Sequence, residues 1–100
     1  MISSLGCTPQ FAHVPNDVIE PEVFTELIVD IRLAEAQEKV YRQKGIYNKE
    51  LLDSSYQMIY ALRGVTPSEF ERSYNWYLNH PNWMEKLSAE AIEKLNRMEK

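Results

Sequence analysis

Apolar side chains recur every three or four residues through most of this chain, which is the spacing of one face of an α-helix. The first such stretch covers residues 21–44, where Pro21 suits the first helical turn and Gly45 can end the last one. The expected inner face of this helix carries Val23, Phe24, Leu27, Ile28, Ile31, Ala34 and Tyr41. The pattern therefore predicts one long amphipathic helix at the start of the folded part of the chain.

A second helix is predicted over residues 49–63. Asn48 precedes it with a side chain that can cap the first turn, and Gly64 follows its last turn. Its expected inner stripe consists of Leu51, Leu52, Ser55, Met58, Ile59 and Leu62.

The clearest local signal in the chain lies at Thr66. Thr66 and Glu69 have the spacing of a capping box, and Pro67 occupies the first helical position. These residues predict a helix over 67–79, which Pro81 prevents from continuing. The side expected to face the core carries Phe70, Ser73, Tyr74, Tyr77 and Leu78.

The last apolar stretch, residues 83–97, repeats the helical spacing after Asn82. Its expected inner positions are Met84, Leu87, Ala91, Leu95 and Met98. No segment of the sequence alternates Val, Ile or Thr with polar residues as a half-buried strand would. Four helices with short connections predict an all-α fold, a compact bundle in which neighbouring helices are mostly antiparallel.

The chain ahead of these helices has a different character. Residues 8–16 have neither helical nor strand periodicity and contain Pro9 and Pro15. We therefore expect residues 1–17 to form an extended tether and residues 18–100 to form one helical domain. No run of 18 apolar residues follows, so the sequence predicts no membrane span within that domain.

Charge and cysteine content exclude several kinds of site. The net charge is −4 and the isoelectric point is about 5.1, which argues against a nucleic-acid partner because phosphate binding needs clustered Lys and Arg. Cys7 is the only cysteine, which excludes an internal disulfide and a cysteine-based zinc site.

The sequence around Cys7 is similar to the end of a bacterial lipoprotein signal. A small residue, Gly6, precedes the cysteine, but Leu5 lies one position closer to it than usual, and the residues ahead supply no charged or long apolar region. Two interpretations follow. Either the true start lies upstream, and the protein is lipid-anchored at Cys7 and faces the periplasm, or Cys7 is an ordinary residue of a cytoplasmic protein.

Several short motifs resemble one family when they are taken together. They are Ile19, Pro21 and Glu22, then Leu33 to Ala36, then Gly64 to Thr66, then Phe70, Ser73, Tyr74 and Tyr77. In this combination the chain resembles the Bacteroidota lipoprotein family called domain of unknown function 4296. The resemblance implies a cell-envelope lipoprotein, with Arg32 at a position where the family pattern has His. It implies no activity, because none is established for the family.

Asp30 and Glu35 are the polar residues that border the apolar face of the first helix. An acid–base pair or a metal site between helices is one interpretation, but the two carboxylates diverge by about 140° around the helix. The favoured interpretation is structural pairing with Arg63, Arg72 or tyrosine hydroxyls, because an unpaired buried charge is costly.

The two histidines complete the polar candidates. Neither His13 nor His80 belongs to a metal-ligand motif, and His80 is expected to interact with free carbonyls at a helix end. The sequence therefore predicts no catalytic residue, cofactor or metal ion.

The aromatic side chains are the main functional candidates. Tyr74 and Tyr77 are expected in the core, whereas helical spacing leaves Trp76, Trp83 and Tyr60 as candidates for binding a partner. The alternative for the tryptophans is packing between the third and fourth helices.

Three classes of function remain. We favour a non-enzymatic interaction or accessory module of the cell envelope, bound to the membrane only through its lipid anchor and contacting an envelope protein. The second class is a periplasmic folding or assembly helper that binds extended chains. A small enzyme, with Asp30, Glu35 and a Tyr or His in one pocket, comes third.

Overall fold

The computed structural model describes residues 11–98 and contains four helices and no strand within that range. They are α1 (Pro21–Gln43), α2 (Lys49–Arg63), α3 (Pro67–Leu78) and α4 (Pro81–Met98). The predicted all-α fold is confirmed. The one boundary that moves by more than a residue is the start of α4. Pro81 begins that helix, and the carbonyl of His80 accepts hydrogen bonds from the backbone N–H groups of Trp83 and Met84.

Side chains and glycines end the helices as the sequence predicts. The Thr66 hydroxyl accepts from the Glu69 N–H at 3.0 Å while the Glu69 carboxylate accepts from the Thr66 N–H at 2.8 Å, which completes the capping box. The Asn48 side chain accepts from the N–H of Glu50 at 2.8 Å. Gly64 follows α2 with a φ of 70°, a left-handed conformation that favours glycine.

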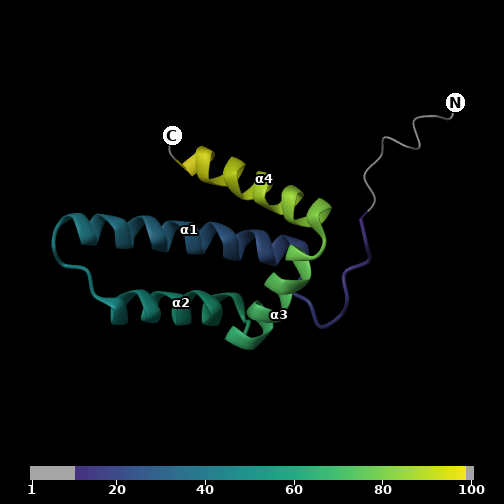
Figure 1. Cartoon of the computed structure of the whole chain (residues 1–100), viewed down its shortest axis with the longest axis horizontal. Coiled ribbons are helices and arrows are strands. Elements are labelled where there is room, and N and C mark those ends of the chain that lie inside the picture. The colour runs from purple at the N-terminus through teal and green to yellow at the C-terminus, as the bar shows by residue number, and fades with distance from the viewer. Residues whose placement is uncertain (1–10, 99–100) are drawn as a thin grey trace, which may run out of the picture.

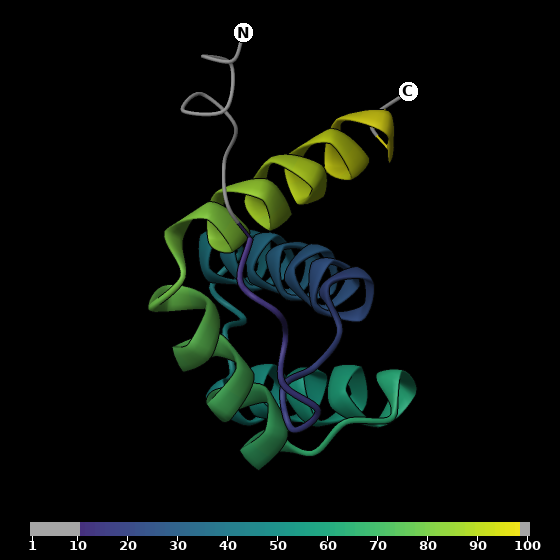
Figure 2. The same ribbon diagram turned by 90° about the vertical axis from the view of Figure 1, so that its right-hand side faces the viewer.

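The helices are arranged around α1 (Figure 1). α2 returns antiparallel to α1 on one side, and α4 lies on the other side and runs in the same direction as α1. Figure 2 shows α3 crossing the end of this arrangement, from the level of α2 to that of α4. The expected antiparallel arrangement therefore holds for α1 and α2 but not for α1 and α4, because α3 carries the chain across the end of the bundle.

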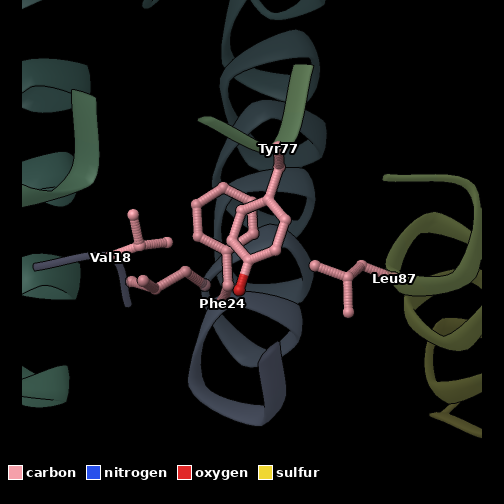
Figure 3. Packing of buried hydrophobic residues seen from close by; sticks show 5 residues of the cluster. Val18, Phe24, Tyr77 and Leu87 are labelled. Carbon is pink, nitrogen blue, oxygen red and sulfur yellow. The ribbon is translucent and has the colours of Figure 1, made fainter. Parts of the chain in front are cut away.

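The core lies at the end where α1 begins. It is formed by a cluster of buried apolar side chains, Val18, Phe24, Leu27, Tyr77 and Leu87. Figure 3 shows the ring of Tyr77 beside that of Phe24, with centroids 4.7 Å apart, and Val18 and Leu87 approaching from opposite sides. Burying one large apolar side chain contributes roughly 1.5–3 kcal/mol, so this cluster is a main source of stability.

Two side chains of α3 form hydrogen bonds with the backbone of the segment that precedes α1. The Tyr77 hydroxyl donates to the carbonyl of Ile19 at 2.7 Å. The buried Ser73 hydroxyl accepts from the Ile19 N–H at 2.8 Å and donates to the Glu69 carbonyl at 2.7 Å. These bonds satisfy polar groups that would be costly to bury alone.

The described part of the expected tether lies against the helices. The ring of Phe11 is 4.8 Å from that of Trp83, and the Trp83 indole N–H donates to the carbonyl of Ala12 at 2.8 Å. Further along, Arg72 donates to the carbonyl of Asp17 at 3.0 Å. Cys7, the lipidation candidate, lies outside the residues that the structure describes.

The expected inner stripe of α2 is wrong in part. No residue of α2 is buried, and Leu51, Met58 and Leu62 have exposed fractions of 52%, 63% and 78%. α2 packs along α1 and meets α3 only near its end, so the apolar positions on its other sides have no neighbour. Ile59 and Tyr60 are half-buried.

α1 and α3 also depart from their expected inner faces. Thr25 and Val29 of α1 are buried although the pattern did not include them, because α1 has helices on two sides. Tyr74 and Leu78 of α3, expected in the core, have exposed fractions of 45% and 51%. α3 crosses the end of α1, so only its side with Ser73 and Tyr77 is fully covered.

Candidate functional site

An open groove of about 670 Å³ runs between α1, α2, α3 and α4. Most of its lining is aliphatic or aromatic, and we call it the aromatic groove. Its lining residues are Ile28, Ile31, Arg32, Glu35, Tyr56, Tyr60, Phe70, Tyr74, Leu78, Met84 and Ser88. The exposed Tyr74 and Leu78 are therefore part of a concave surface to which all four helices contribute.

Phe70 connects the groove to the core. Its ring stacks on that of buried Phe24, with centroids 5.4 Å apart. On the groove side, the centroid of the Phe70 ring is 5.2 Å from that of Tyr60 and 6.0 Å from that of Tyr74. Phe70 therefore links the aromatic side chains of the groove to the buried core.

Two tyrosine hydroxyls of α2 remain protonated at neutral pH. Burial raises the pKa of Tyr60. Burial also raises the pKa of Tyr56, and the charge of Glu35 and the hydrogen bond to its carboxylate raise it further. The Glu35 carboxylate therefore lies next to the Tyr56 hydroxyl.

Arg32 differs from the other arginines. Within residues 11–98 it makes no hydrogen bond or ion pair, and its side chain is exposed at the groove. The others do have partners: Arg42 pairs with Glu38, Arg63 with Asp30 and Glu26, Arg72 with the carbonyl of Asp17, and Arg97 with Glu93.

Asp30 lies in an ion-pair network instead of a pocket. It accepts two hydrogen bonds from the Arg63 guanidinium, at 2.7 and 3.1 Å, and Arg63 is one of the partners suggested from the sequence. Glu26 lies 3.6 Å from Arg63 and 2.9 Å from Lys94. The network joins α1 to both α2 and α4, and the hydrogen bond to Lys94 is the main cause that lowers the pKa of Glu26.

The structure does not bring Asp30 and Glu35 together on one substrate site. Asp30 faces Arg63, near the end of α2, and Glu35 faces Tyr56 two turns earlier in that helix. Among the described residues, no group of three or more His, Cys, Asp or Glu side chains is placed to hold a metal ion.

The three candidates for partner binding lie in different places. Tyr60 lines the aromatic groove, whereas Trp83 is half-buried under Phe11. Trp76 is half-buried as well, and its ring stacks on that of His80 with centroids 3.7 Å apart. The tryptophans therefore form neither a shared exposed patch nor a fully buried pair, because each is covered on one side by its own chain.

His80 lies where the sequence predicts, at the end of α3. Its Nδ1 is 2.6 Å from the carbonyl oxygen of Trp76. His13 is exposed in the segment before α1.

Comparison with known protein families identifies the family of this chain. The family described as "Domain of unknown function (DUF4296)" matches residues 15–100. The chain belongs to this family. No protein of curated function and no solved structure matches it.

All residues of the aromatic groove lie in the part of the chain that matches DUF4296. Cys7 and His13 precede the matched range. None of the described helices is long and apolar enough to cross a membrane.

Arg32, Tyr56 and Ser88 are groove residues that the sequence marked neither as site candidates nor as core positions. Tyr60 was a candidate for partner binding, and the other groove residues with an expected role had been placed in the core: Ile28, Ile31, Phe70, Tyr74, Leu78 and Met84. Periodicity shows which side of a helix is apolar but not whether a neighbour covers it. The sequence did carry one signal for exposed aromatic residues: the helices have more large side chains than one inner face can bury.

Proposed function

We propose that this DUF4296 domain is a non-enzymatic interaction or accessory module of the cell envelope, and that its aromatic groove binds apolar side chains of a partner protein. One observation carries the proposal: all four helices contribute to an open groove whose rim includes the exposed Tyr74 and Leu78. Exposed aromatic side chains in a concave site are typical anchors for protein partners.

The acidic candidates favour binding over catalysis. Asp30 is paired with Arg63, and Glu35 lies close enough to Tyr56 for its charge to raise the pKa of that hydroxyl. Asp30 is therefore held by an ion pair outside the groove, and the two carboxylates do not converge on one position where an acid and a base could act together.

The proposal is tested by photo-crosslinking of the full-length protein in its native host. A photoreactive phenylalanine derivative replaces Leu78 in the groove, and in the matched control it replaces Ile92, which has a similar exposed fraction but does not line the groove. We expect one stoichiometric envelope protein to crosslink from position 78 and not from position 92. Adding Tyr74→Ala should reduce that crosslinking, whereas adding Met58→Ala should not.

The other outcomes separate the remaining classes. Many unrelated nascent proteins crosslinked from position 78 would indicate the folding or assembly helper, for which the apolar lining of the same groove is the supporting observation. Equal crosslinking from positions 78 and 92, or none from either, would contradict both kinds of protein binding through the groove.

The location in the envelope rests on Cys7 and is tested separately. We propose that Cys7 carries a lipid anchor and that the domain faces the periplasm. Metabolic labelling with an alkyne fatty acid, in the native host and from the native locus, should label the protein and fail to label Cys7→Ser. An unlabelled protein recovered from the cytoplasm would overturn this part of the proposal while leaving the groove untested by that experiment.

A further inference from the structure

We propose that the partner segment bound in the aromatic groove is acidic: an Asp or Glu carboxylate binds Arg32 while an adjacent aliphatic or aromatic side chain enters the groove. This inference rests on the proposed function, because it names the chemistry of the partner at the same site.

The first argument is the set of hydrogen-bonding groups that the groove leaves available. Arg32 can only donate, and it makes no hydrogen bond within residues 11–98. The Glu35 carboxylate is the acidic group of the lining, and it lies beside the Tyr56 hydroxyl, which can donate to it. The protonated hydroxyl of Tyr60 adds a donor next to the Phe70 ring. A ligand that supplies acceptors is therefore complementary to this site.

The second argument concerns the kind of acceptor. A guanidinium presents a planar fork of N–H groups that matches the two oxygens of a carboxylate, and such charge-assisted pairs are stronger than bonds to a neutral carbonyl. The chain shows this geometry in its own fold, where Arg63 binds both oxygens of Asp30 at 2.7 and 3.1 Å. Of the arginines, Arg32 is the one whose guanidinium makes no hydrogen bond to the described part of the chain, so it can bind an external carboxylate.

The third argument is that Arg32 lies beside apolar surface. Ile28 and Ile31 precede it on α1, and Tyr74 and Leu78 line the same groove from α3. A segment that carries only acidic residues would leave this surface in water, and a purely apolar one would leave Arg32 without a partner. A segment with a carboxylate next to a large apolar side chain would pair with Arg32 and also cover the apolar surface.

The net charge of the protein makes this recognition depend on a single residue. The chain carries a net charge of −4, so an acidic segment gains nothing from the overall field and is weakly repelled by it. The charged residues that line the groove are Arg32 and Glu35. Removing the charge of Arg32 should therefore abolish the preference for acidic segments.

The test uses the purified chain and a displayed library of random seven-residue peptides. We expect the selected peptides to combine Asp or Glu with a neighbouring Phe, Tyr, Trp, Leu or Ile. A selected peptide is then synthesised with Glu and with Gln at the acidic position, and its affinity is measured by fluorescence anisotropy. The Glu peptide should bind about tenfold more tightly than the Gln peptide, and added salt should reduce the difference.

Two arginine variants distinguish recognition from a general charge effect. Arg32→Gln should bind the Glu and Gln peptides equally. The control Arg42→Gln, on the same helix but outside the groove, should keep the tenfold preference. Arg32 makes no hydrogen bond or ion pair within residues 11–98, so the circular dichroism spectrum and melting temperature of Arg32→Gln should match those of the unaltered protein.

The failures of the two proposals are distinguishable. If Tyr74→Ala removes the crosslinked partner but Arg32→Gln leaves both the partner and the preference for Glu unchanged, the groove binds proteins and the acidic inference is wrong. If selection yields neutral or basic peptides, or no peptide, the inference is also wrong. A concentration-dependent dimer that buries the groove, seen by sedimentation and abolished by Tyr74→Ala, would identify a second copy of this chain as the occupant instead.

Discussion

The two halves of the long helix α1 are stabilised in different ways. Its first half packs among α3, α4 and the segment before it, and carries Phe24, Leu27 and Val29 with almost no exposed surface. From residue 30 to residue 72 no side chain is buried. The far end of the α1–α2 hairpin depends on local contacts, such as the Arg42 guanidinium 3.9 Å from the centroid of the Tyr47 ring. Stability therefore decreases along α1, from the core towards Gly45.

The aromatic groove lies at the boundary between these two regions. Its α3 side rests on the core through Phe70, whereas its α2 side belongs to a helix with no buried residue. Segments with few buried apolar contacts open at low free-energy cost. One wall of the groove is therefore fixed and the other can adjust to a ligand.

The largest expected effect tests the difference in burial between the first half of α1 and α2. Phe24→Ala should destabilise the protein by about 3–5 kcal/mol, because it removes a large ring and leaves a cavity beside Tyr77. Leu62→Ala, in the exposed part of α2, should change the free energy of unfolding by less than about 0.5 kcal/mol. Urea denaturation followed by circular dichroism measures both. Similar losses for the two variants would show that α2 is buried in solution.

A second effect arises from Tyr77 and depends on pH. Burial, with a smaller contribution from the charge of Glu20, raises the pKa of the Tyr77 hydroxyl to about 12. Because this folded-state pKa lies above the ordinary value of 10.0, the contribution of Tyr77 is fully present below about pH 10 and is lost as the pH rises towards 12. Urea midpoints measured between pH 8 and 11.5 should fall steeply above pH 10.

Tyr77→Phe is the matched variant for this alkaline effect. It should cost about 1–3 kcal/mol near pH 7, because the buried carbonyl of Ile19 loses its donor. The variant should also show a flatter decline above pH 10. An unchanged decline would assign the alkaline transition to other groups.

A smaller effect is expected from the ion pairs that join the helices. Asp30→Asn weakens the contact with Arg63, whose side chain is 34% exposed, and should cost about 0.5–1 kcal/mol. Glu93→Gln, in an exposed pair with Arg97 inside α4, should cost less than about 0.5 kcal/mol. Hydrogen exchange should show the loss from Asp30→Asn mainly in α2. A uniform loss over all helices would contradict the local character of the hairpin.

Much of the fold could be predicted because its signals are local. The capping box at Thr66 and the left-handed glycine at position 64 depend only on neighbouring residues, so they appear in the structure as expected. The start of α4 was placed too late because Pro81 ends α3 and also begins the next helix. The extent of burial could not be predicted in the same way, because it depends on which distant segments pack together. Tyr74 and Leu78 have the spacing of core residues but are exposed.

Sequence alone determined that this chain forms four helices, where three of them begin, and which residues are apolar enough to pack. Tertiary structure decided which apolar residues have a neighbour. α3 crosses the end of α1. For this reason Tyr77 of α3 is buried against the core while Tyr74 stays exposed, although the two residues lie on the same side of α3. Tertiary structure also decided that Arg63 is paired with Asp30, whereas Arg32 has no hydrogen-bond partner within residues 11–98. Capping and periodicity act within a few residues of the chain, whereas burial and ion pairing require segments that are distant in sequence to meet.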